Sequence, residues 1–415
     1  MKAVQKDAAE IVVAGHICLD VIPAIAAGKP ARGLGELLVP GRLIDVGPAT
    51  LSTGGAVSNT GLALHRLGLS VKLMGKVGDD PFGGLILRLL SEHGDKLAEG
   101  MIVAPGASSS YSIVVSPPGV DRLFLHATGA NDTFAAEDVT ADAVQGARLF
   151  HFGYPPLMRS MYEDGGAELE RLLGKVKAQG LTVSLDLARP DPASPAGRAD
   201  WRAILARVLP HVDVFLPSFD EILYMLRPDD YRTLSERHGT GELLAYADGS
   251  LLGELSEQLL DMGAAIAGLK LGEYGFYVRT AASAERLRRM GPCAPEEDRL
   301  AAWRDRELLA PCFQVEAVGT TGAGDCTIAG FLAGLVQRLG VEEALLGAVG
   351  TGACCVERAD AISGVSGWNE VRARIAAGWK RSEALLPLPG WTCDERYGIW
   401  ERSNGHRNAM EGKIG

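Results

Sequence analysis

The chain has 415 residues, of which 47% are hydrophobic and 22% charged; this ordinary globular usage excludes a disordered chain and a coiled coil. Its formal net charge of -11 argues against a nucleic-acid partner, because such binding depends on clustered Lys and Arg. No apolar run approaches the ~18 residues of a membrane span and the N-terminus has no signal-peptide core, so we expect a cytoplasmic protein without a membrane partner.

The seven cysteines are scattered and include no C-x-x-C pair. This spacing predicts reduced thiols and suggests neither a disulfide framework nor a zinc site. Cys326 follows a glycine-rich turn, where we expect a small buried thiol and not a nucleophile.

The first part of the chain predicts a small sheet. The run "EIVVAGHICLDVIP" is typical of one buried strand that ends near Asp20 and enters a loop. Short alternating segments follow up to about residue 55. Two further strands are expected at 111–116 and 122–127, joined by a turn at "PPGVD". We therefore place the strands of a small, separate sheet at about 36–53 and 110–128.

After residue 145 apolar strands alternate with amphipathic helices. Examples are "ARLFHFG", "AELERLLGKVKAQG", "LTVSLDLA" and "FDEILYML". That alternation predicts βαβ units in a mostly parallel sheet covered by helices, hence an α/β fold. We expect one main domain over 1–386, a charged insertion at 281–308 and a polar C-terminal tail at 387–415 whose aromatic residues dock on the domain.

The segment "GTTGAGDCTIAGFLAGL" predicts a helix that begins at a glycine turn. Unpaired N–H groups and the dipole at such a helix start favour an anion, and Gly322 and Gly324 leave room for it to approach. Asp325 in the first turn would lie beside that anion, as a general base for phosphoryl transfer must. The alternative is a plain turn in which Asp325 only caps the helix.

A second glycine pair opens the helix in "STGGAVSNTGLALHRLG". Gly54 and Gly55 allow close backbone approach, and Asn59 both donates and accepts hydrogen bonds, which suits a ligand rich in hydroxyl groups. Asp20 could accept from two such hydroxyls. The alternatives are an ordinary turn for the glycines and a solvated loop carboxylate for Asp20.

Together these motifs resemble the PfkB (ribokinase-like) family of carbohydrate kinases. The resemblance spans nearly the whole chain, and it rests on the ordered set "GGAVSNTGLALHRLG", "GKVGDDPFG", "HFG", "LDLARP", "PSFDE", "LKLGEYG" and "TTGAGD". It implies a three-layer α/β/α domain in which the small sheet is a lid over the sugar. It also implies ATP and Mg²⁺ as cofactor partners and a small sugar or sugar-like molecule as substrate. A homodimer through the lid is a further expectation.

The resemblance also implies roles for individual residues. Asp325 matches the catalytic base, and the amides of Gly322, Ala323 and Gly324 match the anion hole. The positions that match sugar-binding residues are Asp20, Gly54, Gly55 and Asn59. Glu221 matches an acid linked to Mg²⁺ and phosphate, while Ser218 and the loop residues Lys270, Gly272 and Gly275 match positions around ATP.

Three positions depart from the family pattern. Ser218 replaces the Asn of an N-x-x-E motif, and Ala188 replaces an Asn in "LDLARP". Gly319 replaces the Asp that begins D-T-x-G-A-G-D. In relatives that bind K⁺ this Asp contributes to the cation site, so the need for a monovalent cation is left open.

Other polar residues are weaker candidates. His16, His65, His126 and His151 are expected to be structural, although His16 could reach a substrate and His126 lies on the presumed lid. Arg122 and Arg189 could contact a charged substrate.

The sequence thus predicts ATP-dependent phosphorylation of a hydroxyl on a sugar or sugar-like substrate. A nucleoside kinase of the same fold and a sugar- or nucleotide-binding regulator with little activity are the alternatives. A dinucleotide dehydrogenase is disfavoured, because no G-x-G-x-x-G follows the first strand.

Overall fold

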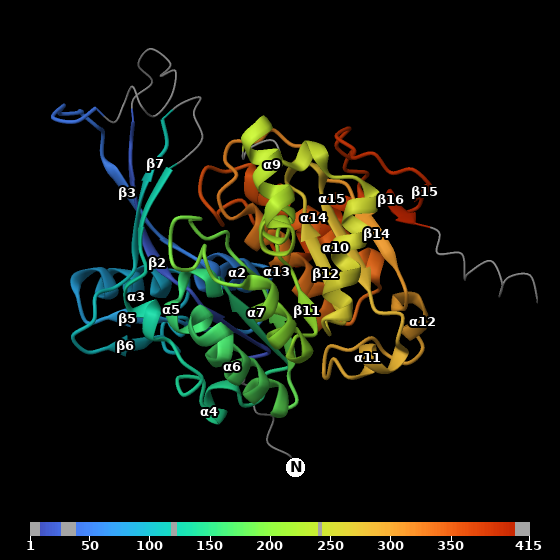
Figure 1. Cartoon of the computed structure of the whole chain (residues 1–415), viewed down its shortest axis with the longest axis horizontal. Coiled ribbons are helices and arrows are strands. Elements are labelled where there is room, and N and C mark those ends of the chain that lie inside the picture. The colour runs from blue at the N-terminus through green and yellow to red at the C-terminus, as the bar shows by residue number, and fades with distance from the viewer. Residues whose placement is uncertain (1–8, 26–38, 118–122, 240–242, 403–415) are drawn as a thin grey trace, which may run out of the picture.

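A ten-stranded sheet forms the centre of the molecule (Figure 1). The computed structural model describes residues 9–25, 39–117, 123–239 and 243–402. In spatial order the strands are β15 (Trp391–Asp394), β16 (Ile399–Arg402), β14 (Glu307–Ala310), β13 (Phe276–Thr280), β12 (Ile266–Lys270), β11 (Val214–Phe215), β10 (Thr182–Leu185), β9 (Leu149–Gly153), β1 (Ile11–Gly15) and β4 (Val71–Met74).

The six strands from β4 to β12 run parallel, and the remaining pairs are antiparallel. The carboxyl ends of the six parallel strands therefore lie at the same edge of the sheet, which is where α/β proteins bind their ligands. Alternate residues of β1 enter different cores: Ile11 and Val13 pack on one face of the sheet, Val12 and Ala14 on the other. This two-sided burial explains the continuous apolar sequence of the strand.

Helices cover both faces and complete the three layers. One core contains side chains from α2 (Ala56–Arg66), α3 (Pro81–His93), α11 (Ala284–Arg288), α12 (Leu300–Trp303), α13 (Ala323–Val336), α14 (Val341–Val356) and α15 (Trp368–Ala376). The other contains side chains from α4 (Ala141–Val144), α5 (Arg159–Tyr162), α6 (Ala167–Ala178), α7 (Trp201–Val208), α8 (Phe219–Leu226), α9 (Pro228–His238) and α10 (Gly249–Asp261). The three-layer α/β/α fold predicted from the sequence is confirmed.

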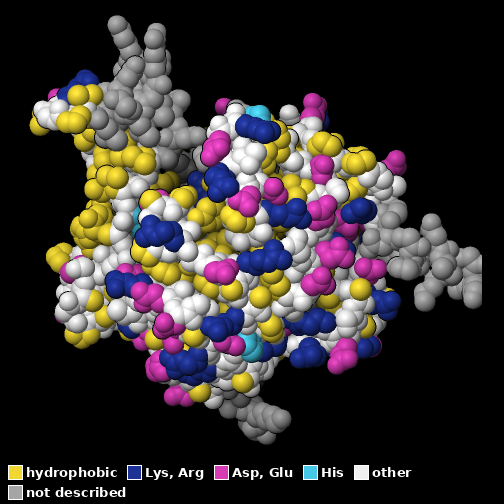
Figure 2. Space-filling model, viewed as in Figure 1, with side chains coloured by type: hydrophobic (Ala, Val, Ile, Leu, Met, Phe, Trp, Pro, Cys, Tyr) yellow, Lys and Arg dark blue, Asp and Glu magenta, His cyan; other side chains and the backbone are white. Residues whose placement is uncertain are grey.

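The predicted small sheet is present, with four strands in the order β3 (Ala49–Gly54), β2 (Cys18–Pro23), β7 (Tyr111–Val115) and β8 (Leu123–Ala127). We call this sheet the lid. It rises from the upper left of the main domain in Figure 1, and hydrophobic side chains cover much of its visible surface in Figure 2. The exposed hydrophobic residues of the lid strands include Leu51, Phe124 and Leu125, each 43–52% exposed. The lid dimer stays a prediction.

The expectation of one strand ending near Asp20 is wrong. The chain leaves the main sheet after Gly15, and β2 begins at Cys18 in the lid. Gly15 has a φ of 124°, which glycine adopts readily and other residues rarely do. A side chain at residue 15 would collide with the backbone of Gly153 on the neighbouring β9. Asp20 therefore lies within a lid strand, opposite Ser52 of β3.

The C-terminal segment also differs from the predicted tail. β15 and β16 extend the main sheet by pairing next to β14, and Trp391 is buried against the core while Trp400 is packed on it. The expected docking of these aromatic residues thus takes the form of a β-hairpin. Residues 403–415 lie outside the described residues. A third sheet in the described residues has two parallel strands, β5 (Lys76–Gly78) and β6 (Ile102–Ala104).

Across the described ranges, no helix combines the length and the apolar character needed to cross a bilayer.

A buried ion cluster joins the segment 281–308, which we predicted to be an insertion, to the main sheet; its last two residues already belong to β14. Asp213, which precedes β11, is fully buried; its carboxylate accepts from Lys177 Nζ of α6 at 2.6 Å and from Arg286 Nη1 of α11 at 2.9 Å. Arg286 also donates to the carbonyls of Val212 and Gly263. Arg286 thus links this charged segment to the start of β11, and Lys177 adds hydrogen bonds to the carbonyls of Arg289 and Met290.

We predict that Asp213→Ala lowers the free energy of unfolding by about 3–5 kcal/mol, because two cations would lose their buried counter-charge. Denaturant unfolding followed by circular dichroism measures this. The exposed Asp142→Ala serves as control and should change the value by less than about 0.5 kcal/mol. Equal stability of the two variants would show that the cluster does not hold the insertion.

Candidate active site

Asp325 lies in the first turn of α13, next to the predicted glycine turn. Gly322 is the N-cap of the helix with φ of 73°, a conformation that side chains other than glycine rarely adopt. A Cβ at this position would also lie 2.6 Å from Cβ of Ala361. The sequence predicted this helix start, and Asp325 is 4% exposed there. The unpaired N–H groups of the first turn face the same end of the helix.

Three side chains from distant parts of the chain hold the Asp325 carboxylate. Asn59 Nδ2 donates to Oδ2 at 3.0 Å and Thr60 Oγ1 donates to Oδ1 at 3.2 Å, both from α2. The Tyr154 hydroxyl, which follows β9, donates to both carboxylate oxygens at 2.9 Å. The carboxylate is therefore fixed in position by neutral donors, with no cation among these contacts.

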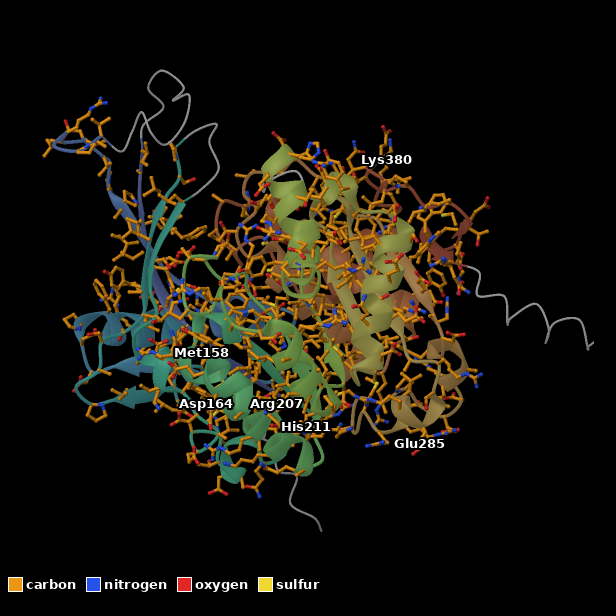
Figure 3. The ribbon with its side chains drawn as sticks, viewed as in Figure 1. Met158, Asp164, Arg207, His211, Glu285 and Lys380 are labelled. Atoms are coloured by element: carbon orange, nitrogen blue, oxygen red, sulfur yellow. The ribbon has the colours of Figure 1, made fainter. Side chains whose placement is uncertain are left out.

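The position of Tyr154 is unusual for its backbone as well as its side chain. Its φ of 66° and ψ of 44° lie in the left-handed region, which costs a residue other than glycine roughly 1–3 kcal/mol. Pro155, Pro156 and the fully buried Met158, labelled in Figure 3, fix the segment that follows. Burial, with the adjacent Asp325, raises the pKa of Tyr154 well above its usual value, so the phenol stays protonated and donates.

The glycine pair at 54 and 55 makes room for two polar groups. A Cβ at Gly54 would overlap the Asp20 carboxylate, and one at Gly55 would lie 2.6 Å from Nδ1 of His16. Gly55 also has φ of 87°. The structure thus brings Asp20, Gly54 and Gly55 together at the base of the lid, as the sequence led us to expect.

A cavity of about 880 Å³ lies between the lid, α2 and the segment before α13. Asp20 and Asn59 line it, with Ser52, Thr53 and residues 317–321. Asp325 does not line it, although Asn59 contacts both the cavity and the Asp325 carboxylate. Two of the predicted substrate residues thus face a space large enough for a sugar, while the predicted base is set back behind its hydrogen-bond donors.

A cluster of ionisable groups lies at the carboxyl ends of β10 and β12. Lys270 Nζ donates to Oδ1 of the fully buried Asp186 at 2.6 Å. Burial, opposed by Lys270, raises the pKa of Asp186 to about 6 and that of Glu221 to about 8. Although burial of Lys270 acts in the other direction, Asp186 and Glu221 raise the pKa of its ammonium group. This cluster has one cation and two carboxyl groups.

Lys270 also lies against the glycine turn. A Cβ at Gly324 would be 3.3 Å from Cδ and 3.9 Å from Nζ of Lys270. The absence of a side chain at Gly324 therefore lets the ammonium approach the start of α13. A positive charge and a helix N-terminus at one place form an environment suited to an anion.

Ser218 and Glu221 form the start of α8 in addition to any role they have with a ligand. Ser218 Oγ accepts from the Glu221 amide at 3.4 Å, Glu221 Oε2 accepts from the Ser218 amide at 2.7 Å, and Ser218 Oγ donates to Asp220. This reciprocal arrangement is a capping box. The S-x-x-E sequence thus has a local structural explanation, and the predicted place of Ser218 around ATP stays a prediction.

The residues of this cluster fit a hard divalent cation. Oδ2 of Asp186 is buried without a hydrogen-bond partner in the described part of the chain, and the buried Glu221 carboxyl group lies near enough to interact electrostatically with Asp186. Carboxylate oxygens are the ligands that Mg²⁺ prefers. The sequence singled out Glu221 for this position and gave Asp186 no role.

The backbone conformation explains why the other two residues predicted to line the ATP site, Gly272 and Gly275, are glycines. Gly272 and Gly275 adopt φ of 54° and 109° in the short turn between β12 and β13, and a Cβ at Gly275 would collide with the Ala310 carbonyl. Their predicted place around ATP stays a prediction. At Gly319, a Cβ would lie 2.9 Å from the carbonyl oxygens of both Arg358 and Ala359, so a side chain there would require the backbone to shift.

The weaker candidates from the sequence lie at several places in the fold. His151 is buried and contacts Ser184 at 3.0 Å; burial, with Lys270, lowers its pKa to about 3. Arg189 interacts with Asp220 and Tyr231 at the surface. His65 lies partly buried near the end of α2. Cys326 is the buried thiol expected, with its pKa raised. Arg122 lies outside the described residues.

His16 and His126 contact each other where the lid joins the main domain, near Tyr154. Their Nε2 atoms are 3.2 Å apart, and the His16 ring centroid is 6.1 Å from that of Tyr154. Burial lowers the pKa of both imidazoles, so they are neutral at physiological pH.

Sequence reasoning missed Tyr154, Thr60 and the unpaired oxygen of Asp186. "HFGYPP" placed Tyr154 at the end of a strand, which was a usable signal of position. The left-handed conformation that turns its hydroxyl toward Asp325 had no signal, because such a conformation is uncommon for any residue but glycine.

Comparisons with known proteins agree with this architecture. The model of the pfkB family carbohydrate kinases matches residues 9–367. An uncharacterized sugar kinase from Archaeoglobus fulgidus is 27% identical over 306 residues, covering 73% of this chain and 98% of the relative. A probable fructokinase-4 from Arabidopsis thaliana is 24% identical over 340 residues, covering 80% and 84% respectively.

Solved structures share the fold. The Arabidopsis thaliana ribokinase complexed with ribose and ATP has a TM-score of 0.63 at 17% identity, with 88% of this chain and 98% of that one covered. The Xylella fastidiosa fructokinase with bound ATP has a TM-score of 0.63 at 18% identity, covering 89% and 98%. With the family match over most of its length, this chain belongs to the pfkB family of carbohydrate kinases.

Proposed function

We propose that this carbohydrate kinase transfers the γ-phosphoryl group of ATP to a hydroxyl of a sugar or sugar-like alcohol, with Asp325 as general base. The observation that carries the proposal is the placement of a fixed, buried carboxylate in the first turn of α13, beside the glycine turn and Lys270. A base within reach of the acceptor and a cationic helix N-terminus for the phosphoryl group are the two elements this reaction needs.

In the proposed reaction, Asp325 accepts the proton of the acceptor hydroxyl as its oxygen attacks the γ-phosphorus. The bond from that phosphorus to the bridging oxygen of ATP breaks, and ADP leaves. The amides of Gly322, Ala323 and Gly324 stabilise the charge on the moving phosphoryl oxygens, and Lys270 adds its positive charge. Asp20, Asn59 and the glycine pair orient the acceptor beneath the lid, which excludes water.

Asp186 and Glu221 are the residues that would hold Mg²⁺, and the ion would neutralise phosphate charge there. Ser218 keeps Glu221 in place through the capping box, so its contribution is to position the carboxyl group.

A nucleoside remains the alternative acceptor within this fold. One structural neighbour is a nucleoside kinase from Methanocaldococcus jannaschii, with a TM-score of 0.58 and 17% identity. A weakly active regulator is the other alternative, and the intact Asp325 and glycine turn argue against it. ADP release measured over pentoses, hexoses, keto-deoxy acids and nucleosides distinguishes the three: the best acceptor names the class, and binding without ADP release with any acceptor would contradict a kinase.

We predict that Asp325→Asn lowers kcat with the best acceptor by about 10²–10⁴-fold, because the amide cannot accept the proton. ADP release coupled to a spectrophotometric assay measures this, and circular dichroism checks the fold. The exposed Asp142→Asn should keep wild-type activity. Turnover of the Asp325 variant within a few-fold of wild type would remove the base assignment.

Tyr154 is a positioning residue in this proposal. Its hydroxyl occupies both oxygens of Asp325, so an acceptor hydroxyl must displace it from at least one of them. Hydrogen bonds to a charged group contribute roughly 1.5–3 kcal/mol each, so breaking one opposes acceptor binding. The same contact keeps the base from deprotonating water when the acceptor is absent.

We therefore predict that Tyr154→Phe lowers the acceptor KM by roughly ten-fold, the equivalent of about 1.4 kcal/mol, and increases ATP hydrolysis without acceptor. Steady-state kinetics with and without acceptor measure both quantities. Tyr162→Phe, outside the site, is the matched control. A higher KM together with a lower kcat, and no change in hydrolysis, would mean that Tyr154 contacts the acceptor directly and does not hold the base.

The glycine at 319 predicts kinase activity that does not depend on K⁺. An aspartate side chain has no room there, since the carbonyls of Arg358 and Ala359 occupy its place. We expect kcat in potassium, sodium and bulky organic-cation buffers to agree within about two-fold, and Gly319→Asp not to create activation. Activation by K⁺ of about ten-fold or more, some 1.4 kcal/mol, would contradict this reading.

A further inference from the structure

A compact set of metal-binding atoms lies where the lid joins the main domain. His16 belongs to the connection between β1 and β2, Cys18 begins β2, and His126 lies in β8. One ligand atom from each of these three side chains lies within 4.8 Å of the others. The fold thus brings together, from segments more than 100 residues apart, a donor set that the sequence spacing of the cysteines did not suggest.

The two histidines are already spaced as ligands of one ion. Zinc–nitrogen bonds of about 2.0–2.1 Å in a tetrahedral site place two ligand nitrogens about 3.3–3.4 Å apart. Nε2 of His16 and Nε2 of His126 are 3.2 Å apart. An ion can therefore replace the single hydrogen bond between the rings with little movement of either side chain.

Cys18 needs a small adjustment. Tetrahedral geometry with a zinc–sulfur bond of about 2.3 Å places sulfur about 3.6 Å from each nitrogen, a closing of up to roughly 1 Å. Sγ now lies 3.4 Å from Oδ1 of Asp20 and 3.8 Å from Oγ of Ser112, and it also interacts with the Gly54 backbone. The Asp20 carboxylate is close enough to supply or orient a fourth ligand.

The neighbouring Ser112 can accommodate the metal-binding tautomer of His126. Ser112 Oγ lies 3.0 Å from Nδ1, so an Nδ1–H that donates to Ser112 leaves the Nε2 lone pair directed at His16. Nδ1 of His16 is buried and has no partner in the described part of the chain. A hydrogen bond between the rings therefore leaves this pair incompletely satisfied, which is uncommon for a purely structural role.

We propose that His16, Cys18 and His126 form a binding site for a tetrahedral transition-metal ion of the zinc class. Two imidazoles and a thiolate select such an ion over Mg²⁺, which prefers oxygen ligands. The ion joins two lid strands, β2 through Cys18 and β8 through His126, to the connection between β1 and β2 that carries His16. Because Asp20 borders the site, the bound ion blocks the acceptor; this second consequence rests on the proposed function, whereas metal binding itself does not.

The test is a cobalt titration of the full-length, tag-free protein, reduced and freed of metal. Wild type should bind one Co²⁺ per chain with visible bands typical of tetrahedral coordination and a thiolate-to-cobalt charge-transfer band, and Zn²⁺ should remove both. Cys18→Ser should lose the charge-transfer band, and the partly exposed His126→Gln should bind at least about ten-fold more weakly.

Cys393→Ser, at an exposed free thiol on β15, is the matched control and should keep all bands. Thermal unfolding confirms that each variant is folded. An absence of tetrahedral cobalt bands in wild type, or a charge-transfer band that persists in Cys18→Ser, would overturn the site and leave only a hydrogen-bonded histidine pair.

In the kinase assay, Zn²⁺ should raise the apparent KM for the acceptor in wild type and leave that for ATP unchanged, with the effect lost in His126→Gln. The titration requires no turnover. A protein that binds cobalt as described but releases no ADP with any acceptor contradicts the proposed function and supports the metal site, so the two failures are distinguishable.

Discussion

The arrangement of the site depends on the hydrogen bonds that fix the Asp325 carboxylate. They join α13 to α2 through Asn59 and Thr60, and to the end of β9 through Tyr154. A buried carboxylate without such donors would carry a large desolvation cost. Three neutral donors supply the hydrogen bonds that this buried carboxylate needs.

The same contact explains why the glycine turn and the glycine pair matter together. Gly322 begins α13 in a left-handed conformation and sets the direction of Asp325, while the pair at 54 and 55 begins α2 and sets Asn59 and Thr60 one turn inside. The strained backbone of Tyr154 is also needed for this contact, because it directs the Tyr154 hydroxyl toward Asp325. Lys270 then brings the acidic cluster of Asp186 and Glu221 to the same helix start.

The sequence predicted the fold and much of the site because both depend on local patterns. Alternating apolar strands and amphipathic helices specify a three-layer architecture, and a glycine turn before an apolar helix specifies where Asp325 lies. The break between β1 and β2 falls at Gly15 and His16, and two residues between apolar runs did not reveal that the chain changes sheets there. The C-terminal hairpin was hidden for a related reason: edge strands with polar neighbours look like a tail.

Contacts between distant segments were beyond the sequence. Tyr154 reaches Asp325 across 171 residues and His16 meets His126 across 110, with no local pattern to announce either. Ser218 shows the reverse case, where a motif taken from a resemblance also has a complete local explanation as a capping box. The side chains that surround Asp325 therefore had to be found in three dimensions.

In the proposed reaction Asp325 serves as the base once an acceptor takes the place of the Tyr154 hydroxyl. A crystal structure with the best acceptor and a non-hydrolysable ATP analogue would test this step. We expect an acceptor hydroxyl about 2.6–3.2 Å from an Asp325 carboxylate oxygen, with Tyr154 displaced from that oxygen. A complex in which Tyr154 still donates to both oxygens and the acceptor hydroxyl lies elsewhere would contradict it.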